Sequence, residues 1–249
     1  MTFTFAGLLA ATWRLLRRSL DPVIAITALF VFLPAFAALL LSDPVPPIPP
    51  APRDELAMQA WVTAMAQWGQ ANGLWFVVAD VAGIFGAAAV AVLLLDADRP
   101  TVGQALRIAS RTFWPFLIAS VAIAVPVGIG LWLFVLPGLY VQARLVASIP
   151  AIARRPGLGV GRAIRVSLAM TRGHGWAITG ALVTLFLAQY LVAVPLMQAD
   201  EWLRMPGNAN PLLLSLVDAG IAAVGAIYAT GTLLVGICLL YTSPSPRDS

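Results

Sequence analysis

Six long apolar runs divide this chain, and gaps of very different length separate them. The runs are Pro22–Leu41, Leu74–Leu95, Trp114–Leu136, Leu139–Ala153, Trp176–Leu196 and Leu212–Ile237. Most have about 20 residues, enough for a helix to cross a hydrocarbon core of about 30 Å. Because the bilayer interior offers a bare backbone no hydrogen-bond partner, such runs must be helical. The pattern predicts an all-α, polytopic membrane bundle with six transmembrane helices.

The basic residues alternate in number from one gap to the next. All 15 are arginine. The N-terminal tail, the second gap and the fourth gap hold Arg14, Arg17, Arg18, Arg99, Arg107, Arg111, Arg154, Arg155, Arg162, Arg165 and Arg172. The intervening gaps hold only Arg53 and Arg204. Since cytoplasmic loops retain Lys and Arg, we expect a bacterial inner-membrane protein with both termini in the cytoplasm.

Composition agrees with this class. Apolar residues make up 60% of the chain and charged residues 10%, whereas soluble proteins carry about 25% charged residues. The net charge of +4 comes from the arginines, for which anionic lipid is a simpler partner than nucleic acid. A cleaved secretory signal is the alternative for the first run, because Ala35–Ala37 resembles a cleavage site. The run nevertheless continues to Leu41, which is spanning length.

Three basic segments precede spans and are expected to lie on the membrane surface. In Phe3–Leu20 the residues Leu8, Leu9, Trp13, Leu16 and Leu20 recur at helical spacing. Thr101–Arg107 aligns with Gly159–Arg165, which indicates an internal repeat. The residues expected to face lipid in these two segments are Val102, Leu106, Ala109, Val160, Ile164 and Leu168. The residues expected to contact lipid headgroups are Arg14, Arg17, Arg18, Arg107, Arg111, Arg162, Arg165 and Arg172.

The chain therefore resembles three copies of one unit, an interfacial amphipathic helix followed by a two-span hairpin. Such repetition is common in membrane proteins that move solutes. It is equally common where duplication built a bundle, so transport and a structural role both stay open. Small residues four apart, such as Ala82 and Gly86, Gly83 and Ala87, and Gly225 and Ala229, favour close helix contact within the chain or in a dimer.

Two connections carry recognisable turn or surface signals. The first outer loop is proline-rich, and after Asp54 the residues Met58, Trp61, Met65 and Trp68 form an apolar stripe. We expect that stripe to lie on the outer headgroups, with a lid over a substrate as the alternative. Between the third and fourth runs, Pro137–Gly138 predicts a tight turn.

Three charged residues lie inside the apolar runs, namely Asp80, Arg144 and Asp218. At a rise of about 1.5 Å per residue, these residues and Gln189 all fall about 8–10 Å from the outer ends of their spans. A charge inside a membrane is costly alone, so we expect Arg144 to bridge Asp80 and Asp218. This polar cluster is either a pin that fixes helix register or a site for a headgroup or a coupling proton.

Part of the chain resembles a known family. The residues that carry the resemblance are Leu136–Tyr140, Arg144, Gly161, Ala163, Ile164, Arg165, Ser167 and Thr171–Gly173. They are similar to the bacterial membrane domain found on some glycerophosphodiester phosphodiesterases and to its stand-alone six-span relatives. The likeness extends from the first run to about Ile237. It implies a six-helix membrane domain and no catalysis, because the activity of fused members belongs to a separate soluble barrel.

The last residues of the chain are expected not to come from the natural gene. Cys238–Asp248 is similar to a translated transposase adapter used in sequencing libraries. We therefore expect one membrane domain over residues 1–237 and treat 238–249 as not biological. The only cysteine falls in that tail, which leaves no basis for a disulfide or a thiol-based site.

No catalytic, metal or cofactor site is expected. His174 is the only histidine and has no neighbouring carboxylate or cysteine for a metal site. Gly157–Gly161 lacks the spacing of a dinucleotide loop, and Ser148 and Ser167 lack a base nearby in sequence. The favoured function is a non-enzymatic membrane scaffold or anchor that binds anionic lipid, with a protein partner or a homo-oligomer. The alternatives are a transporter or lipid-handling permease and, third, an intramembrane enzyme.

Overall fold

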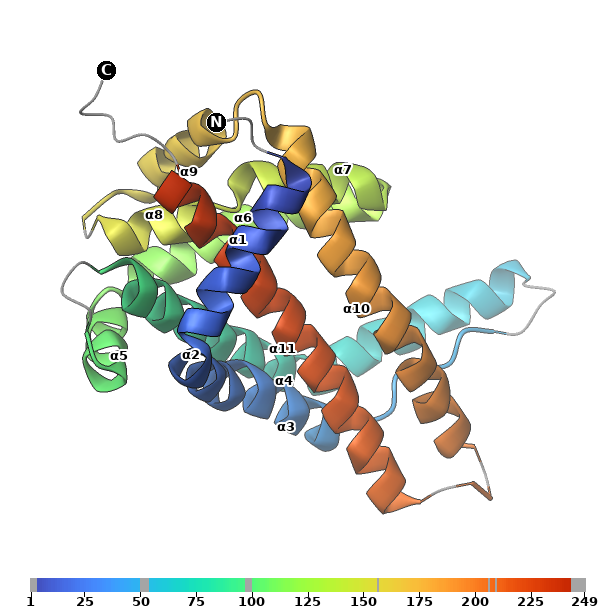
Figure 1. Cartoon of the computed structure of the whole chain (residues 1–249). Coiled ribbons are helices and arrows are strands. Elements are labelled where there is room, and N and C mark those ends of the chain that lie inside the picture. The colour runs from blue at the N-terminus through green and yellow to red at the C-terminus, as the bar shows by residue number, and fades with distance from the viewer. Residues whose placement is uncertain are drawn as a thin grey trace.

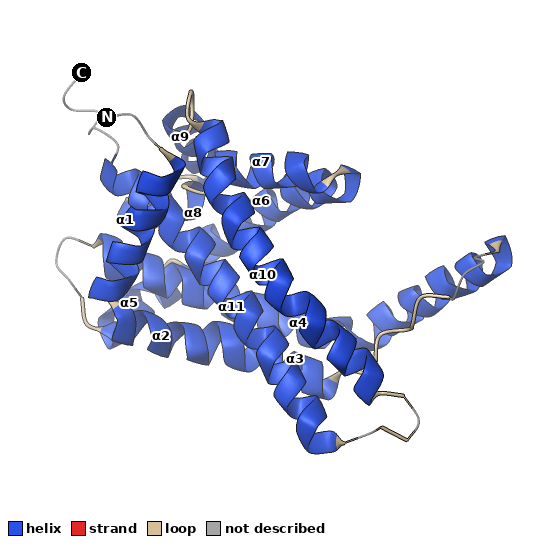
Figure 2. Ribbon diagram, turned by 45° about the vertical axis from the view of Figure 1, so that its right-hand side comes forward, coloured by secondary structure: helices blue, strands red, loops and turns tan. Residues whose placement is uncertain are grey.

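The computed structural model describes residues 4–49, 54–96, 100–155, 157–205, 207–208 and 210–242. Within them Figure 2 shows helices and loops but no strands. The helices are α1 (Phe5–Arg18), α2 (Leu20–Thr27), the π-helix η1 (Ala28–Phe32), α3 (Leu33–Leu41), α4 (Glu55–Leu95), α5 (Val102–Arg111), α6 (Phe113–Leu133), α7 (Val135–Leu145), α8 (Ser148–Arg154), α9 (Val160–Met170), α10 (Gly175–Leu203) and α11 (Pro211–Thr242).

Six segments in the described part of the chain are long and apolar enough to cross a membrane. They are Leu20–Leu41, Glu55–Leu95, Phe113–Leu133, Val135–Arg154, Gly175–Leu203 and Pro211–Tyr241. This confirms the predicted all-helical class and span number, and it indicates a multi-pass membrane protein. Consecutive spans pack together, α3 along α4, α6 along α7 and α10 along α11 (Figure 1).

The first span is one helix with a local change of winding. Helices α2, η1 and α3 follow one another without a break, and the backbone N–H of Leu33 donates to the carbonyl of Ala28. Pro34 follows directly and has no N–H of its own to give to the preceding turn. A short π-turn beside the proline keeps the span continuous.

Helix α4 is much longer than the predicted second span, which was expected to start at Leu74. It begins after Asp54, whose side chain accepts a hydrogen bond from the backbone N–H of Ala57 at 2.6 Å. Its N-terminal half extends away from the other helices as the cyan segment of Figure 1. The span and the preceding surface segment are thus one continuous helix.

The apolar stripe of α4 has a partner within the chain. The indole of Trp61 donates to the carbonyl of Pro46 at 3.2 Å, and the indole of Trp68 donates to the carbonyl of Asp43 at 2.8 Å. Asn72 is buried, and its amide oxygen accepts from the backbone N–H of Asp43 at 2.8 Å. The proline-rich segment thus turns back along the stripe and gives two of its indoles hydrogen-bond partners, while the four stripe residues stay half-exposed. That the stripe lies on outer headgroups stays a prediction. Pro50, Pro52 and Arg53 lie outside the described residues.

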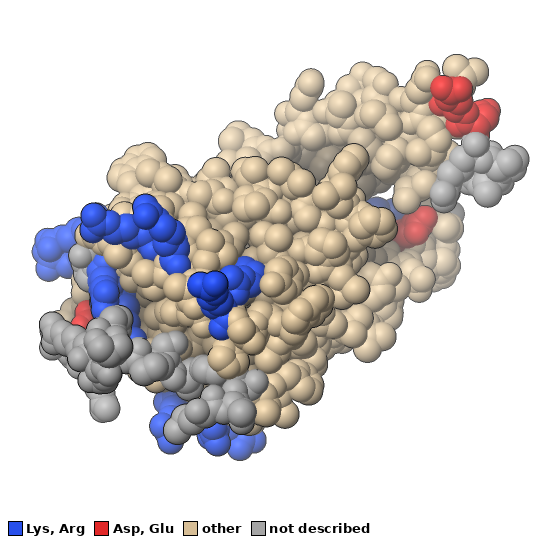
Figure 3. Space-filling view, turned by 90° about the horizontal axis from the view of Figure 1, so that it is seen from above, with Lys and Arg blue, Asp and Glu red and all other residues tan. Residues whose placement is uncertain are grey.

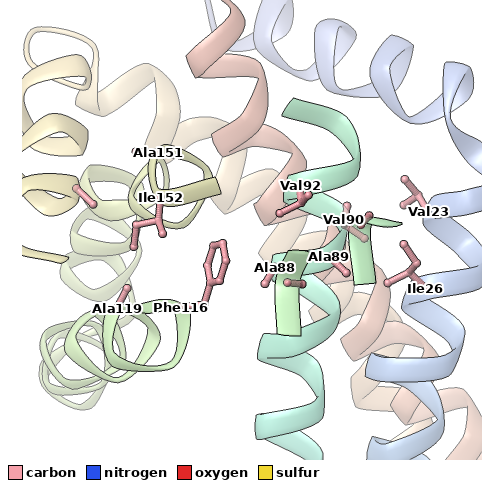
Figure 4. Packing of buried hydrophobic residues seen from close by; sticks show 13 residues of the cluster. Val23, Ile26, Ala88, Ala89, Val90, Val92, Phe116, Ala119, Ala151 and Ile152 are labelled. Carbon is pink, nitrogen blue, oxygen red and sulfur yellow. The ribbon is translucent and has the colours of Figure 1, made fainter. Parts of the chain in front are cut away.

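The largest buried cluster sits where the spans converge with the short helices. Figure 4 shows Val23 and Ile26 of α2 against α4, and Phe116 of α6 beside Ile152 of α8. Alanines of α4, including Ala88 and others that are fully buried, let these helices approach closely. This cluster fixes the bundle near the C-terminal end of α4.

The basic helices α5 and α9 dock on that bundle. Ala105 and Ala109 are fully buried, and Val102 and Leu106 pack against the same cluster. Val160 of α9 packs there too. The prediction that these helices point their apolar faces to lipid was therefore wrong for Ala109, which the protein covers completely, while Val102, Leu106 and Val160 are half-buried against the protein. Ile164 is half-buried and Leu168 exposed.

Helix α1 also packs on the protein through part of its apolar face. Leu8 is buried against α10 and α11, while Trp13 and Leu20 remain exposed. The predicted stripe of this helix therefore divides between protein contact and the outer surface.

The turn between α6 and α7 lies at Phe134, whose backbone is extended. Pro137 and Gly138 were predicted to form this turn but lie within the first turns of α7. A Cβ on Gly138 would stand 2.5 Å from the backbone nitrogen of Leu131, and one on Gly130 would stand 2.8 Å from the Cα of Gly138. The glycines allow α6 and α7 to touch backbone to backbone beside the turn.

The other small residues behave differently from one another. A Cβ on Gly86 would lie 2.7 Å from the Cβ of Phe30, so this glycine lets α4 approach the first span. Among the described residues, no heavy atom of another segment lies within 4 Å of such a Cβ on Gly83 or Gly225. Of the predicted close contacts, the Gly86 contact within the chain is present.

The charges separate toward opposite ends of the molecule. Figure 3 shows most of the visible arginines at one end and the visible carboxylates mainly at the other. We call the end that carries the arginines of α1, α5, α8 and α9 the basic end, and the opposite end the far end. Helix α11 runs to the basic end and includes Cys238–Thr242, the start of the predicted adapter segment. Residues 243–249 and Arg99 lie outside the described part of the chain.

Candidate functional site

The eight arginines predicted to meet lipid headgroups are all exposed and come from three helices or their C-terminal ends. They are Arg14, Arg17 and Arg18 of α1, Arg107 and Arg111 of α5, and Arg162, Arg165 and Arg172 of α9 and the turn after it. The guanidinium of Arg17 lies over the ring of Trp13 at 5.1 Å from its centroid. Helices α1, α5 and α9 pack on the spans, so they hold these arginines at the surface of the basic end.

Local sequence explains where these basic helices start. The Thr101 side chain accepts from the backbone N–H of Gln104, while the Gln104 side chain accepts from that of Thr101 at 2.9 Å. This reciprocal capping box satisfies two backbone donors at the start of α5. A second local signal ends the other basic helix. Gly173, in the turn between α9 and α10, has a φ of 80°, a conformation that glycine adopts without strain.

Arg144 is not the centre of an intramembrane bridge. Its Nη2 donates to the backbone carbonyl of Leu168 in α9 at 3.0 Å. This contact draws it to the basic helix, whereas Asp218 pairs with a different arginine. The predicted Asp80–Arg144–Asp218 bridge was therefore wrong, because Arg144 contacts α9 and Asp218 pairs with Arg204 instead.

The residues around Arg144 brace that break. Helix α7 ends at Leu145 and α8 begins at Ser148. The fully buried Ser167 hydroxyl donates to the Arg144 carbonyl at 2.8 Å and accepts from the Ala147 N–H at 3.2 Å. Thr171 adds a contact of 3.4 Å to the same carbonyl. Backbone groups freed by a helix break thus find partners, which gives the Arg144, Ser167 and Thr171 motif a structural role.

Asp218 is held at the far end by Arg204. Its side chain is almost fully buried, and its Oδ1 lies 3.6 Å from Nη2 of Arg204. The Nε of Arg204 also contacts both carboxylate oxygens of Asp200, at 2.9 and 3.0 Å. A buried carboxylate in an apolar helix requires such a partner. The sequence placed Arg204 in an outer gap, and the helical run of α10 as far as Leu203 brings it back to α11.

Asp80 and Gln189 lie apart from that ion pair. Asp80 is exposed on the surface of α4. Gln189 of α10 is half-buried, and its Oε1 is buried with no hydrogen-bond partner among the described residues. The structure therefore does not gather the four residues of the predicted polar cluster into one contact network.

A different set of polar side chains links the spans. The hydroxyl of Tyr228 in α11 donates to Oε1 of Gln142 in α7 at 3.0 Å, and Phe186 packs edge-on against the Tyr228 ring. The hydroxyls of Thr27 and Thr230 are 3.1 Å apart, joining α2 to α11. The sequence analysis missed Tyr228 and the threonine pair. A tyrosine in the middle of an apolar run was the available signal.

Among the described residues, no group of three or more His, Cys, Asp and Glu side chains is arranged to hold a metal ion. No family model, no curated protein and no solved structure matches this chain.

Proposed function

We propose that this chain is a non-catalytic scaffold or anchor of the bacterial inner membrane that binds anionic lipid through its basic end. The observation behind this proposal is the set of eight exposed arginines on α1, on α5, and on α9 with the turn that follows it. From the positive-inside rule we infer that the basic end and the N-terminus face the cytoplasm. The partners in this proposal are membrane lipids and either a protein or a second copy of the chain.

The unit structure of the chain supports the same proposal. Each hairpin of spans is preceded by one basic helix, α1, α5 or α9, which we interpret as three related units. The resemblance of the Arg144, Ser167 and Thr171 region to phosphodiesterase membrane domains points in this direction, since those domains carry no catalytic residues. Each arginine near an anionic leaflet contributes about 1 kcal/mol of attraction.

The first test removes charge from the two docked helices. We expect Arg107→Gln, Arg111→Gln, Arg162→Gln and Arg165→Gln together to lower the enrichment of phosphatidylglycerol around the protein by at least about threefold. The measurement is lipid analysis of particles extracted from membranes with a styrene–maleic acid copolymer. The matched control replaces the same four residues by lysine, which keeps the charge and should keep most of the enrichment. Equal lipid composition in wild-type and glutamine particles would refute lipid binding by these helices.

Transport is the second candidate, and the polar contacts inside the bundle favour it. The Gln142–Tyr228 bond and the buried Gln189 oxygen lie on apolar spans, where polar groups often mark solute or proton pathways. In this candidate the pathway passes between α7, α10 and α11.

The test of transport removes the hydroxyl of Tyr228 and measures flux across a membrane. If the bundle conducts, Tyr228→Phe is expected to reduce proton or solute flux in proteoliposomes by about tenfold, because it removes the donor to Gln142. Tyr190→Phe on the same bundle is the control, since Tyr190 is exposed. A pH-sensitive dye under an imposed membrane potential reports proton movement, and a radiolabelled solute panel reports the rest. Liposomes as tight with wild-type protein as without it would exclude this candidate.

A further inference from the structure

A cavity of about 940 Å³ opens at the basic end, where several helix ends meet. Arg18 and Ser19 contribute from the junction of α1 and α2, Asp96 from the end of α4, and Arg154 from the end of α8. Small-molecule sites in proteins commonly have volumes of about 300–1,000 Å³. The cavity is therefore large enough for a lipid headgroup or a small phosphorylated metabolite.

The arginines of the cavity retain hydrogen-bonding capacity. The Arg18 side chain makes no hydrogen bond or ion pair with any residue that the structure describes. Arg154 donates from Nη1 to the carbonyl of Leu240 at 2.8 Å, which leaves most of its five N–H donors for a ligand. A smaller cavity of about 180 Å³ shares Arg18 and adds Arg14. Against these cations the described lining includes the single carboxylate of Asp96, so an anion is the favoured ligand.

One wall of the same cavity is apolar. Leu15 of α1 and the Leu93–Leu95 end of α4 line it beside the arginines. Guanidinium groups recognise phosphate oxygens with paired hydrogen bonds, and leucines cover an apolar neighbour of the phosphate. A ligand that satisfies both walls carries a phosphate ester next to hydrocarbon.

We propose that this cavity is a specific site for one phosphate ester, with Arg18 and Arg154 binding its phosphate and the leucines covering its apolar part. The inference rests on the proposed lipid-binding basic end and adds a single defined site to a distributed surface. An anionic phospholipid headgroup and a soluble glycerol phosphate share this chemistry. Arg18, Arg154 and the leucine wall all precede Ile237, so the proposed ligand contacts lie within the expected natural chain. Tyr241, which also lines the cavity and donates to the Leu94 carbonyl, is not among them.

The experiment counts ligands on the delipidated full-length protein by native mass spectrometry. Dioleoyl phosphatidylglycerol, glycerol 3-phosphate, inorganic phosphate and dioleoylglycerol are titrated separately. We expect one phosphatidylglycerol to bind per chain before any others, and no first-site binding of dioleoylglycerol, which lacks the phosphate. Arg18→Gln with Arg154→Gln should weaken that first binding step by about tenfold or more. Arg18→Gln alone, which removes no bond to a described residue, should weaken it severalfold and keeps the test valid if the double variant misfolds.

The matched control is Arg155→Gln, which removes the same single charge as Arg18→Gln but lies outside the cavity lining and outside the eight arginines of the lipid surface. It should leave the first binding step within about twofold, because Arg155 does not line the cavity. Equal weakening by Arg155→Gln and Arg18→Gln would overturn the defined site while leaving the distributed lipid surface in place. If neither Arg18→Gln nor the cavity double variant weakens the first binding step, the site is overturned. That conclusion holds whether or not the lipid analysis of the copolymer-extracted particles supports lipid binding by α5 and α9. Tight binding of glycerol 3-phosphate that the cavity variants abolish would assign the site to a soluble ligand.

Discussion

Gly138→Ala is expected to destabilise the protein by about 3 kcal/mol, although alanine is the better helix former by about 1 kcal/mol. A Cβ at this position would stand 2.5 Å from both the backbone nitrogen and the Cγ of Leu131. The leucine side chain can rotate, but its backbone cannot move without separating α6 from α7. Denaturation by sodium dodecyl sulfate in mixed micelles measures the loss.

Gly128→Ala is the control for that substitution. Gly128 lies on helix α6 before the turn and is exposed, and no heavy atom of another described segment lies within 4 Å of a Cβ there. We expect this change to be neutral or slightly stabilising. If both substitutions had the same effect, the close approach of α6 and α7 would not be the reason for a glycine at 138.

Arg204→Gln is expected to cost about 3 kcal/mol of folding stability, because it leaves a buried carboxylate without its cation. Asp218 is only 3% exposed, and the nearest cation, Arg204, lies 3.6 Å away. Surface ion pairs contribute at most about 1 kcal/mol, so a large loss would identify the Asp218 contact as the important one. The same micelle denaturation, or the midpoint of thermal unfolding, measures it.

Asp218→Asn separates the pair from other roles of the arginine. In the Arg204→Gln background it should restore more than half of the lost stability, since an amide is cheaper to bury than an unpaired carboxylate. Glu201→Gln, an exposed neighbour at the same helix end, is the control and should change stability little. Strict additivity of Arg204→Gln and Asp218→Asn would mean that the two side chains do not interact.

These two predictions concern residues whose chemistry was visible in the sequence but whose partners were not. An aspartate inside an apolar run needs a cationic partner, and Arg144 was the cation predicted at nearly the same membrane depth as Asp218. The structure gives Asp218 a cation from the far-end loop instead, because α10 extends seven residues beyond the expected end at Leu196. Depth counted along straight spans fails when helices run past the apolar stretch or break, as α7 does before Ala147.

The Pro137–Gly138 pair illustrates the same limit at a smaller scale. Proline and glycine are common in turns, but both are also accepted in the first turns of a helix, where proline's missing N–H costs little. The sequence could not tell that the chain reverses at Phe134 and that Gly138 is needed for close packing. That requirement comes from Leu131, which faces it from the preceding helix.

The sequence by itself determined the helical class, the six spans and which arginines lie outside the apolar runs. The physical reasons are local, since an apolar run must satisfy its own backbone in lipid and each charge is either inside a run or outside it. Only the tertiary structure decided that α5 and α9 bury part of their apolar faces on the bundle, that Arg204 rather than Arg144 meets Asp218, and that Arg18 and Arg154 share a cavity. Those outcomes depend on which helix lies beside which, and pairings between segments far apart in the chain leave no periodic signal along it.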